Sequence, residues 1–268
     1  MEIGGKMFDD KNHVYMIGVL NITPDSFFDG GRFNSKKLAL MQAEKLISEG
    51  ADLIDVGAES TRPNSLPITC EEEISRLGDV VVELKKQFNV PVSVDTTKAK
   101  VAEIVLNQGA DLINDISGLS DARMAGVVAA FNSVYCLTSN FQLPVGENFL
   151  KIMKLEFEKK ISMLEEQGVA RNKIILDPGI GFNKTCEQNL LVLKYISEIK
   201  SWGFPLLVGA SNKSFIGKVL NQPDVNLRQA GTLAVSAMLA FCNVNFIRVH
   251  DVKSNLEAVK IVSAIRSA

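Results

Sequence analysis

Short apolar runs rich in valine and isoleucine alternate along the chain with longer segments whose apolar residues recur every three to four positions. Runs of the first kind are typical of buried strands, and segments of the second kind are typical of amphipathic helices. Eight such strand–helix units can be counted, which predicts a parallel sheet. The expected strands are residues 14–20, 53–56, 92–94, 112–114, 134–137, 174–176, 206–208 and 246–249.

Two helix-to-strand connections have nearly the same sequence, Gly-Ala-Asp-Leu-Ile-Asp at 50–55 and Gly-Ala-Asp-Leu-Ile-Asn at 109–114. Glycine after a helical run is typical of a left-handed C-terminal cap, so we expect the two connections to share one geometry. In the helix that precedes the first of them, the apolar spacing predicts one buried face. That face would consist of Leu38, Met41, Leu46 and Ile47.

Eight parallel units with no ninth strand favour a closed (β/α)8 TIM barrel over an open doubly wound sheet. The chain of 268 residues has the usual length of such a barrel and shows no low-complexity linker. We therefore predict a single α/β domain over residues 1–268. In a barrel of this kind, function is expected at the carboxyl ends of the strands.

Composition narrows the function further. The net charge of −2 provides no positive field for nucleic acid, and the four cysteines show no metal-binding or disulfide spacing. No apolar run reaches the roughly 18 residues of a membrane span, and the N-terminal segment carries Asp9 and Asp10 where a secretory signal would be basic. A cytoplasmic protein with small-molecule substrates is the prediction.

Polar residues follow every expected strand, which places them on one rim of the barrel. They are Asn21, Asp55, Asp95, Asn114–Asp115, Thr138–Ser139, Asp177, Ser211–Ser214, Arg248 and His250. A single Asp or Asn at a strand end commonly caps the next helix, and this alternative holds for each residue alone. Eight such positions in succession favour a shared site.

Asp95, Asn114 and Asp177, together with Lys213, would suit a planar heterocycle that has N–H donors on one edge and a carbonyl on another. The same oxygens could bind a metal ion, although hard-metal sites usually contain no lysine. The cationic side chains Arg62, Arg248 and His250 flank Asn21 in the predicted barrel. They indicate a phosphate or pyrophosphate site, and ion pairs with Asp55 or Asp251 are the alternative.

Residues 21–31 break from an apolar strand into turn residues around Phe27 and Phe28. Apolar rings in a loop at a barrel mouth favour a substrate cover, and a surface loop packed on its own core is the alternative. Residues 209–217 lead from the seventh strand into a helix whose first amides could bind a carboxylate. Ser214 could also be a plain N-cap there.

The motifs of this chain resemble those of the dihydropteroate synthases, in the order found in that family and over nearly the whole length. The matching segments are residues 18–27 with 29–31, 55–63, 93–96, 113–116, 177–182, 213–217 and 248–251. The resemblance implies a transferase of folate biosynthesis. It would condense 6-hydroxymethyl-7,8-dihydropterin pyrophosphate with 4-aminobenzoate to give 7,8-dihydropteroate and pyrophosphate, by SN1-like loss of pyrophosphate.

The resemblance also implies roles for individual residues. Pterin would be bound by Asp95, Asn114, Asp177 and Lys213. Pyrophosphate would be bound by Asn21, Arg62, Arg248 and His250, with Asn21 also a ligand of Mg²⁺. The 4-aminobenzoate pocket, where sulfonamides would compete, would consist of Phe27, Thr61, Pro63, Phe182, Lys213 and Ser214. The catalytic set would be Asn21, Arg62, Asp95, Lys213, Arg248 and His250, and the protein would be a homodimer.

Two segments depart from the pattern of that family. Thr138-Ser139 stands where His-Met is usual, and Asn212 replaces an arginine in Ser-Arg-Lys-Ser. A divergent paralogue of low activity and a barrel that transfers a methyl group from methyltetrahydrofolate are the alternatives, as is a non-catalytic pterin-binding subunit. The residues expected to bind pyrophosphate favour the synthase, because the methyltransferase does not need a pyrophosphate site.

Overall fold

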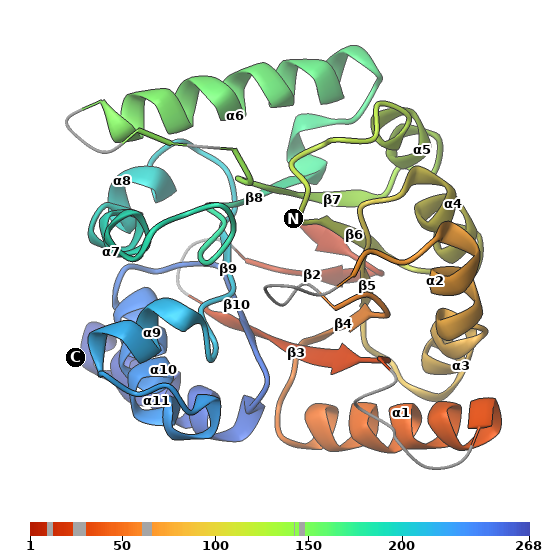
Figure 1. Ribbon diagram of the computed structural model, residues 1–268, viewed down its shortest axis with the longest axis horizontal. Helices are drawn as coiled ribbons and strands as arrows, with labels where there is room; N and C mark the ends of the chain where they lie inside the picture. Colours follow the sequence, from red (N-terminus) through yellow and green to blue (C-terminus); the bar gives the residue numbers. More distant parts are fainter. Residues whose placement is uncertain (10–12, 24–30, 61–65, 142, 145–147) are drawn as a thin grey trace.

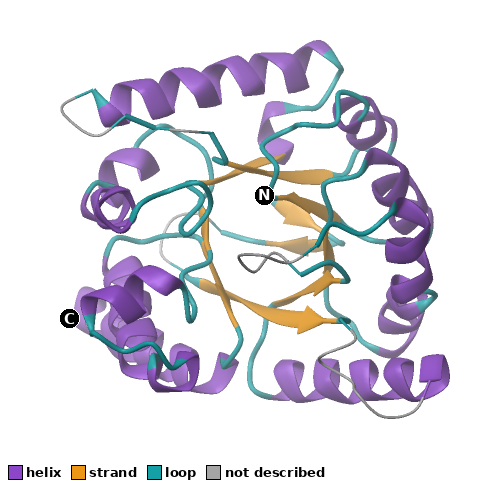
Figure 2. Cartoon of the chain, viewed as in Figure 1, coloured by secondary structure: helices purple, strands orange, loops and turns teal. Residues whose placement is uncertain are grey.

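Eight parallel strands form a ring at the centre of the computed structural model, and helices surround the ring (Figures 1 and 2). The structure describes residues 1–9, 13–23, 31–60, 66–141, 143–144 and 148–268. Neighbouring strands follow the order β8-β7-β6-β5-β4-β3-β10-β9. A parallel bridge between Leu176 and Leu206 joins the two ends of this series, so the sheet closes into a barrel. The predicted (β/α)8 TIM barrel is confirmed.

The strands of the barrel are β3 (Tyr15–Asn21), β4 (Leu53–Gly57), β5 (Val92–Asp95), β6 (Leu112–Asp115), β7 (Val134–Thr138), β8 (Ile174–Asp177), β9 (Leu207–Val208) and β10 (Phe246–Val249). The helices are α1 (Gly31–Ser48), α2 (Cys70–Leu77), α3 (Val80–Gln87), α4 (Ala99–Asn107), α5 (Met124–Ala130), α6 (Phe149–Glu166), α7 (Cys186–Lys194), α8 (Ile196–Lys200), α9 (Ser214–Val219), α10 (Gln229–Phe241) and α11 (Val252–Ser267). Single 3₁₀ turns lie at η2 (Arg171–Lys173) and η3 (Val225–Leu227). No helix within the described residues has the length and apolar character needed to cross a membrane.

All eight expected strands are present, but most of them end one residue later than the sequence predicts. Asp95, Asp115, Thr138 and Asp177 are the last residues of their strands and do not belong to the following loops. The apolar pattern stops before these residues. A strand continues past it because its backbone hydrogen bonds do not depend on side-chain polarity.

Alternation along the strands divides the barrel interior into an apolar floor and a polar mouth. Ile17, Leu53, Leu112, Val134 and Phe246 lie in one buried apolar cluster, together with Cys136, Ile175 and Leu207. Residues two positions further along a strand point to the same side of the sheet. The next layer towards the strand ends is therefore also interior, and it contains the polar residues Asp55, Asn114 and Asp177.

A short hairpin that the sequence pattern did not predict closes the floor of the barrel. Its strands β1 (Glu2–Ile3) and β2 (Lys6–Met7) pair antiparallel. Ile3 and Phe8 are 1% and 4% exposed and belong to the floor cluster, where the Phe8 ring lies 5.6 Å from that of Phe246. Strands of two residues are too short to show a period of two, so no alternation could indicate them.

The two similar connections do share one geometry, as predicted. Gly50 and Gly109 have φ angles of +102° and +100°. The aspartates that follow, Asp52 and Asp111, each accept a hydrogen bond of 2.8 Å from a backbone amide at the start of the preceding strand, from Met16 and Val92. The repeated sequence therefore encodes a helix-to-strand turn whose aspartate ties it to the neighbouring strand.

The predicted buried face of α1 is wrong in part. Leu46 is fully buried, but Leu38 and Met41 are 39% and 55% exposed. The residues that face the core are Ala39, Ala43 and Leu46, at helical spacing. Small side chains let α1 lie close to the barrel, where a Cβ added to Gly18 would be only 3.2 Å from Leu46 Cβ. Ranking residues by hydrophobic size therefore placed Leu38 and Met41 wrongly, whereas Leu46 and Ile47 do pack on the core.

Candidate functional site

The interior layer at the carboxyl ends of the strands brings most of the predicted site residues together. Strand register pairs Gly57 with both Asn21 and Asp95, Asp95 with Asn114, and Thr138 with Asp177. On β10, Arg248 lies in the same interior layer, two residues after Phe246 of the floor. The barrel thus presents carboxylates, an amide and a guanidinium within one cavity mouth.

Arg248 is held by two carboxylates. Its Nε donates to Asp55 Oδ2 at 2.6 Å, and its second terminal nitrogen donates to Asp95 Oδ2 at 3.2 Å. The side chains of Asp55 and Asp95 are only 1% and 13% exposed. The ion pair between Arg248 and Asp55 that we considered as an alternative is therefore present. It is buried, so the cation is fixed in direction.

Asp55 is a central residue to which the sequence interpretation assigned a place on the rim and an alternative ion pair, but no binding role. It accepts hydrogen bonds from the Ser93 hydroxyl, from Asn114 Nδ2 at 3.2 Å and from Arg248. Through it, residues of β4, β5, β6 and β10 belong to one network. A charged residue inside an otherwise apolar strand was the signal available, because a buried carboxylate needs several partners.

The carboxyl group of Asp95 has a strongly perturbed pKa. Burial raises its pKa to about 7, and the nearby negative charge of Asp55 raises it too, while Arg248 and Lys213 act in the opposite direction. Burial likewise raises the pKa of Asp177, whose Oδ1 accepts from the Gly179 amide at 2.7 Å. Perturbed carboxylates clustered in a cleft are typical of functional sites.

Asn114 is 2% exposed and keeps an unsatisfied acceptor. Its Nδ2 donates to Asp55, but its Oδ1 has no hydrogen-bond partner among the described residues. Buried acceptors are nearly always paired in native proteins, so an exception calls for a specific explanation. A ligand donor at the barrel mouth would supply the missing bond.

Lys213 enters the same mouth from the connection between β9 and α9. Its Nζ lies 4.0 Å from the centre of the Phe182 ring. Burial lowers its pKa to about 8, and the positive charge of Arg248 lowers it too, while Asp177 and Asp95 oppose the change. Two predicted members of the 4-aminobenzoate pocket, Phe182 and Lys213, are therefore in direct contact.

The residues on either side of Lys213 differ in their roles. Helix α9 begins at Ser214 and its N-cap is Lys213, so the alternative of Ser214 as the N-cap is wrong. Asn212 has a φ of +58° and its amide donates to Thr232 Oγ1 at 3.1 Å. Asparagine tolerates this left-handed conformation better than most residues, so the departure at position 212 suits the local backbone.

His250 and Asp251 follow β10. The His250 ring is exposed, and its Nδ1 lies 3.0 Å from Ser211 Oγ. Asp251 caps α11 by accepting from the Ser254 amide at 3.1 Å, as the capping alternative predicts.

Asp115, the last residue of β6, is also structural. It faces away from the barrel interior and accepts from the Tyr135 hydroxyl at 2.6 Å.

Lys184 was missed by the sequence interpretation. Its Nζ donates to the Ser139 carbonyl at 2.6 Å and to the Phe182 carbonyl at 3.3 Å, which ties the turn after β8 to the end of β7. Gly179 in this turn has a φ of +73°, and a Cβ there would lie 2.0 Å from the Ser139 oxygen. The turn that carries Phe182 is thus held tightly, although a lone lysine after a Gly-rich turn gave no sequence signal.

Four predicted site residues lie outside the described part of the chain: Phe27, Thr61, Arg62 and Pro63. The same holds for most of the segment interpreted as a substrate cover, of which Asn21, Ile22 and Thr23 are described. His13, before the first barrel strand, is exposed. Within the described residues, no group of three or more His, Cys, Asp and Glu side chains could hold a metal ion.

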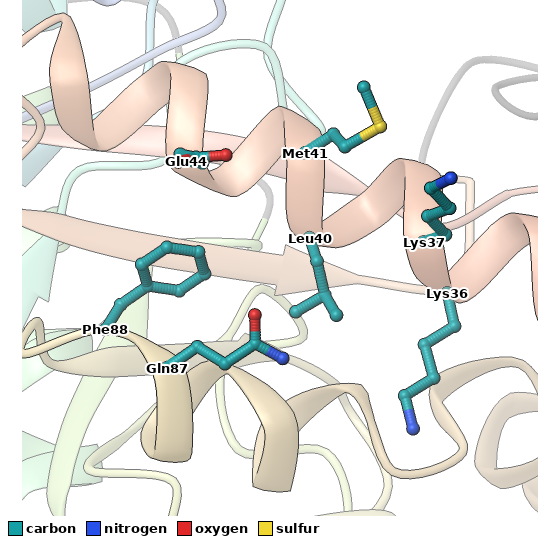
Figure 3. Close-up of a pocket in the computed structure, with 7 residues that line it drawn as sticks. All are labelled: Lys36, Lys37, Leu40, Met41, Glu44, Gln87 and Phe88. Carbon is teal, nitrogen blue, oxygen red and sulfur yellow. The ribbon is translucent and has the colours of Figure 1, made fainter.

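A separate cavity of about 290 Å³ lies on the outer side of the barrel, between α1 and α3 (Figure 3). Leu40 and Phe88 project into it from the two helices, and Lys36, Lys37, Met41, Glu44 and Gln87 complete its lining. It contains none of the predicted site residues. The chemistry of the mouth is therefore the stronger indication of function.

A barrel whose mouth combines these groups is a pterin-binding enzyme: residues 17–250 match the family model described as "Pterin binding enzyme", and the chain belongs to that family. A dihydropteroate synthase of Clostridium beijerinckii is 44% identical over 269 residues, with 99% of each chain covered. The relatives place the chain, within the family, among the dihydropteroate synthases, as the motifs indicated.

Solved structures agree with this assignment. The dihydropteroate synthase of Clostridium difficile, determined in the presence of pteroic acid, has a TM-score of 0.92 and 40% identity, covering 97% of this chain and 99% of its own. That of Xanthomonas albilineans with 4-aminobenzoic acid has a TM-score of 0.93 and 30% identity, covering 99% and 97%. The predicted class of enzyme, a transferase, is confirmed.

The raised pKa of Asp95 predicts a pH dependence of stability. The folded protein protonates this carboxyl group below about pH 7, and the unfolded chain does so only near 3.8. Between these values the folded state holds more protons, so the free energy of unfolding falls as the pH rises through this window. In Asp95→Asn the free energy of unfolding should decrease less over this pH window. Urea denaturation at several pH values measures this.

The control for this prediction is Glu257→Gln, a change at an exposed residue of α11. This variant should show the full decrease of the wild-type protein. Identical pH profiles for Asp95→Asn and the wild type would show that Asp95 does not titrate as its burial requires.

Proposed function

We propose that this protein condenses 6-hydroxymethyl-7,8-dihydropterin pyrophosphate with 4-aminobenzoate, giving 7,8-dihydropteroate and pyrophosphate in folate biosynthesis. The observation that carries the proposal is the interior layer in which Asp95, Asn114 and Asp177 surround one mouth with Lys213. The ligands named for the two solved relatives, pteroic acid and 4-aminobenzoic acid, are the product type and one substrate of this reaction.

The pterin would lie against the acceptors of β5, β6 and β8. Asn114 Oδ1 has no partner among the described residues, and Asp177 is 4% exposed, so both are placed to receive N–H donors away from water. Each hydrogen bond to a charged group contributes about 1.5–3 kcal/mol. Lys213 adds a donor for a carbonyl oxygen or ring nitrogen of the heterocycle.

The pyrophosphate would lie towards β3 and β10, near Asn21 at the end of β3, Arg248 within β10 and His250 just after it, with Arg62 joining from the second loop. Arg248 is positioned in advance by Asp55 and Asp95, so binding does not have to order its long side chain. A guanidinium can bind two phosphate oxygens at once.

The 4-aminobenzoate would lie beside the Phe182 ring and Lys213, whose Nζ contacts that ring at 4.0 Å from its centre. Its carboxylate would interact with the Lys213 ammonium group and with Ser214, which is exposed at the first position of α9. Phe27, Thr61 and Pro63 would complete the pocket. Sulfonamides, which share the aryl amine, would compete at the same place.

The reaction would proceed by cleavage before attack. The C–O bond breaks first, and its electron pair leaves with the pyrophosphate, so a pterin-methyl cation forms. The lone pair of the neutral aryl amine then forms the C–N bond, and the nitrogen loses its proton afterwards. Fixed carboxylates favour the cation and Arg248 favours the leaving group, because oriented charges need no reorganisation during the reaction.

Mg²⁺ would assist through few protein ligands. Oxygen donors suit this ion, which usually keeps several waters and binds through substrate phosphates and one or two protein groups. Asn21 Oδ1 and Asp95 Oδ2 both border the space beside Gly57, at 3.7 and 4.0 Å from a Cβ placed there. This donor set fits an ion brought by the pyrophosphate, and Asn21 would hold it. The ion would neutralise charge on the leaving group.

The decisive experiment for the proposed function is an assay of the purified protein with both substrates and Mg²⁺. We expect pyrophosphate release that depends on 4-aminobenzoate, with 7,8-dihydropteroate formed in equal amount. No pyrophosphate under saturating conditions would remove the synthase assignment. Transfer of a methyl group from methyltetrahydrofolate would favour the alternative barrel instead.

Arg248→Lys tests whether Arg248 acts on the pyrophosphate. Lysine keeps the charge between Asp55 and Asp95 but loses the fork that binds two oxygens. We expect binding of the pterin pyrophosphate to weaken by about tenfold and binding of pteroic acid to stay within about twofold. Titration calorimetry with both ligands measures this, and an equal loss for the two would contradict the assignment.

The protein would form a homodimer through α9, α10 and α11, which lie together beside the C-terminus (Figure 1). Apolar side chains on this side are exposed, among them Phe241 at 65%, Ile261 at 65% and Ile265 at 63%. Exposed apolar groups gathered on one side are typical of a protein interface. Light scattering should give twice the chain mass of 29.3 kDa, and a monomer at micromolar concentration would exclude the dimer.

The cytoplasmic location stays a prediction.

A further inference from the structure

Thr138, the last residue of β7, has a buried hydroxyl group that forms no hydrogen bond within the part of the chain that the structure describes. The residue is 0% exposed, and its Oγ1 has no hydrogen-bond partner among the described residues. Leaving such a group unpaired lowers the stability of the folded protein. Valine has nearly the same shape and would avoid this cost, so the hydroxyl has no role in the folded state without ligand.

The strand register places this hydroxyl in the layer of the pterin site. Thr138 pairs with Asp177 of β8, and paired residues of parallel strands point to the same side of the sheet. Thr138 also follows Cys136 of the barrel floor by two residues, and Cys136 pairs with Asn114 of β6. Thr138 is therefore interior, in the mouth layer, with Asn114 and Asp177 on the two neighbouring strands.

Two unsatisfied polar atoms thus occur on adjacent strands of one site. They are Asn114 Oδ1 and Thr138 Oγ1, each at a residue no more than 2% exposed. A single orphan could be an isolated defect of packing, but two on the same interior surface indicate a shared polar partner. An amide oxygen only accepts, and a hydroxyl both donates and accepts, so together they suit a heterocycle edge that alternates donors and acceptors.

We propose that Thr138 is a binding residue for the pterin, and that its hydroxyl forms a hydrogen bond with the edge of the heterocycle that Asn114 and Asp177 also contact. The proposal rests on the proposed function, since it names a further contact within that site. Thr138 belongs to one of the two segments in which this chain departs from the usual sequence of the family that it resembles.

Thr138→Val separates binding from stability because the two effects have opposite signs. Removing an unpaired hydroxyl should leave the free energy of unfolding of the ligand-free protein unchanged or higher. The Kd for pteroic acid and the KM for the pterin pyrophosphate should rise by about five- to tenfold. The KM for 4-aminobenzoate should stay within about twofold, because the hydroxyl lies on the pterin side.

Two further variants control the test. Thr138→Ser keeps the hydroxyl and should restore pteroic acid binding to within about twofold of the wild type. Ser133→Ala removes a buried hydroxyl at the other end of the same strand, where Oγ donates to the carbonyls of Val134 and Asp111. It should lower stability and leave both KM values unchanged, which is the reverse of the Thr138→Val pattern.

The outcomes distinguish this proposal from the one it rests on. Wild-type protein that neither binds pteroic acid nor releases pyrophosphate would overturn the proposed function. Wild-type protein that does both, with unchanged constants in Thr138→Val, would overturn the role of Thr138 alone. Lower stability of Thr138→Val with unchanged binding would show that ordered water, and not the pterin, satisfies the hydroxyl.

Discussion

Closure of the parallel sheet imposes the constraint on which the rest of the structure depends. In a closed barrel, every second residue of each strand must point inside, so one choice of register decides which side chains share the interior. Here the floor layer is apolar and is sealed from below by Ile3 and Phe8. The layer above the floor is polar. Its side chains come together because the packed floor holds the strands at this spacing.

Charge balance then decides which polar groups this layer can contain. Among the described residues of the mouth, the carboxylates Asp55, Asp95 and Asp177 face the cations Arg248, Lys213 and Lys184. A buried ion is tolerated only when partners replace its water. The fixed network around Asp55 supplies those partners for Arg248, whereas burial lowers the pKa of both lysines to about 8. An anionic substrate entering this mouth would stabilise the charged lysines.

The fold was predictable from sequence because its signals are periodic and repeated. Strands of four or more residues can be recognised by their runs of valine and isoleucine. A polar residue at each strand end indicates the mouth of the barrel. Contacts between particular side chains that are far apart in the sequence were not predictable. Examples are the hydrogen bond from Arg248 to Asp95, the hydrogen bond from Lys184 to the Ser139 carbonyl, and the alanine face of α1. The ion pair of Arg248 with Asp55 was foreseen only as an alternative to phosphate binding. Periodicity assigns residues to faces, but it carries no information about which side chains meet across strands far apart in sequence.

The departures from the family pattern have different physical meanings. Asn212 satisfies a left-handed backbone and bonds with Thr232, so its replacement of arginine serves the local structure at the expense of one cation. Thr138 shows the opposite balance, because its hydroxyl has no hydrogen-bond partner among the described residues and lies on the strand next to Asp177. A protein that keeps an uncompensated polar group beside Asn114 and Asp177 gives up stability for recognition. The contact proposed for Thr138 would add a pterin-binding group on β7, whereas Asn212 leaves the loop before α9 with one cation fewer than the family pattern.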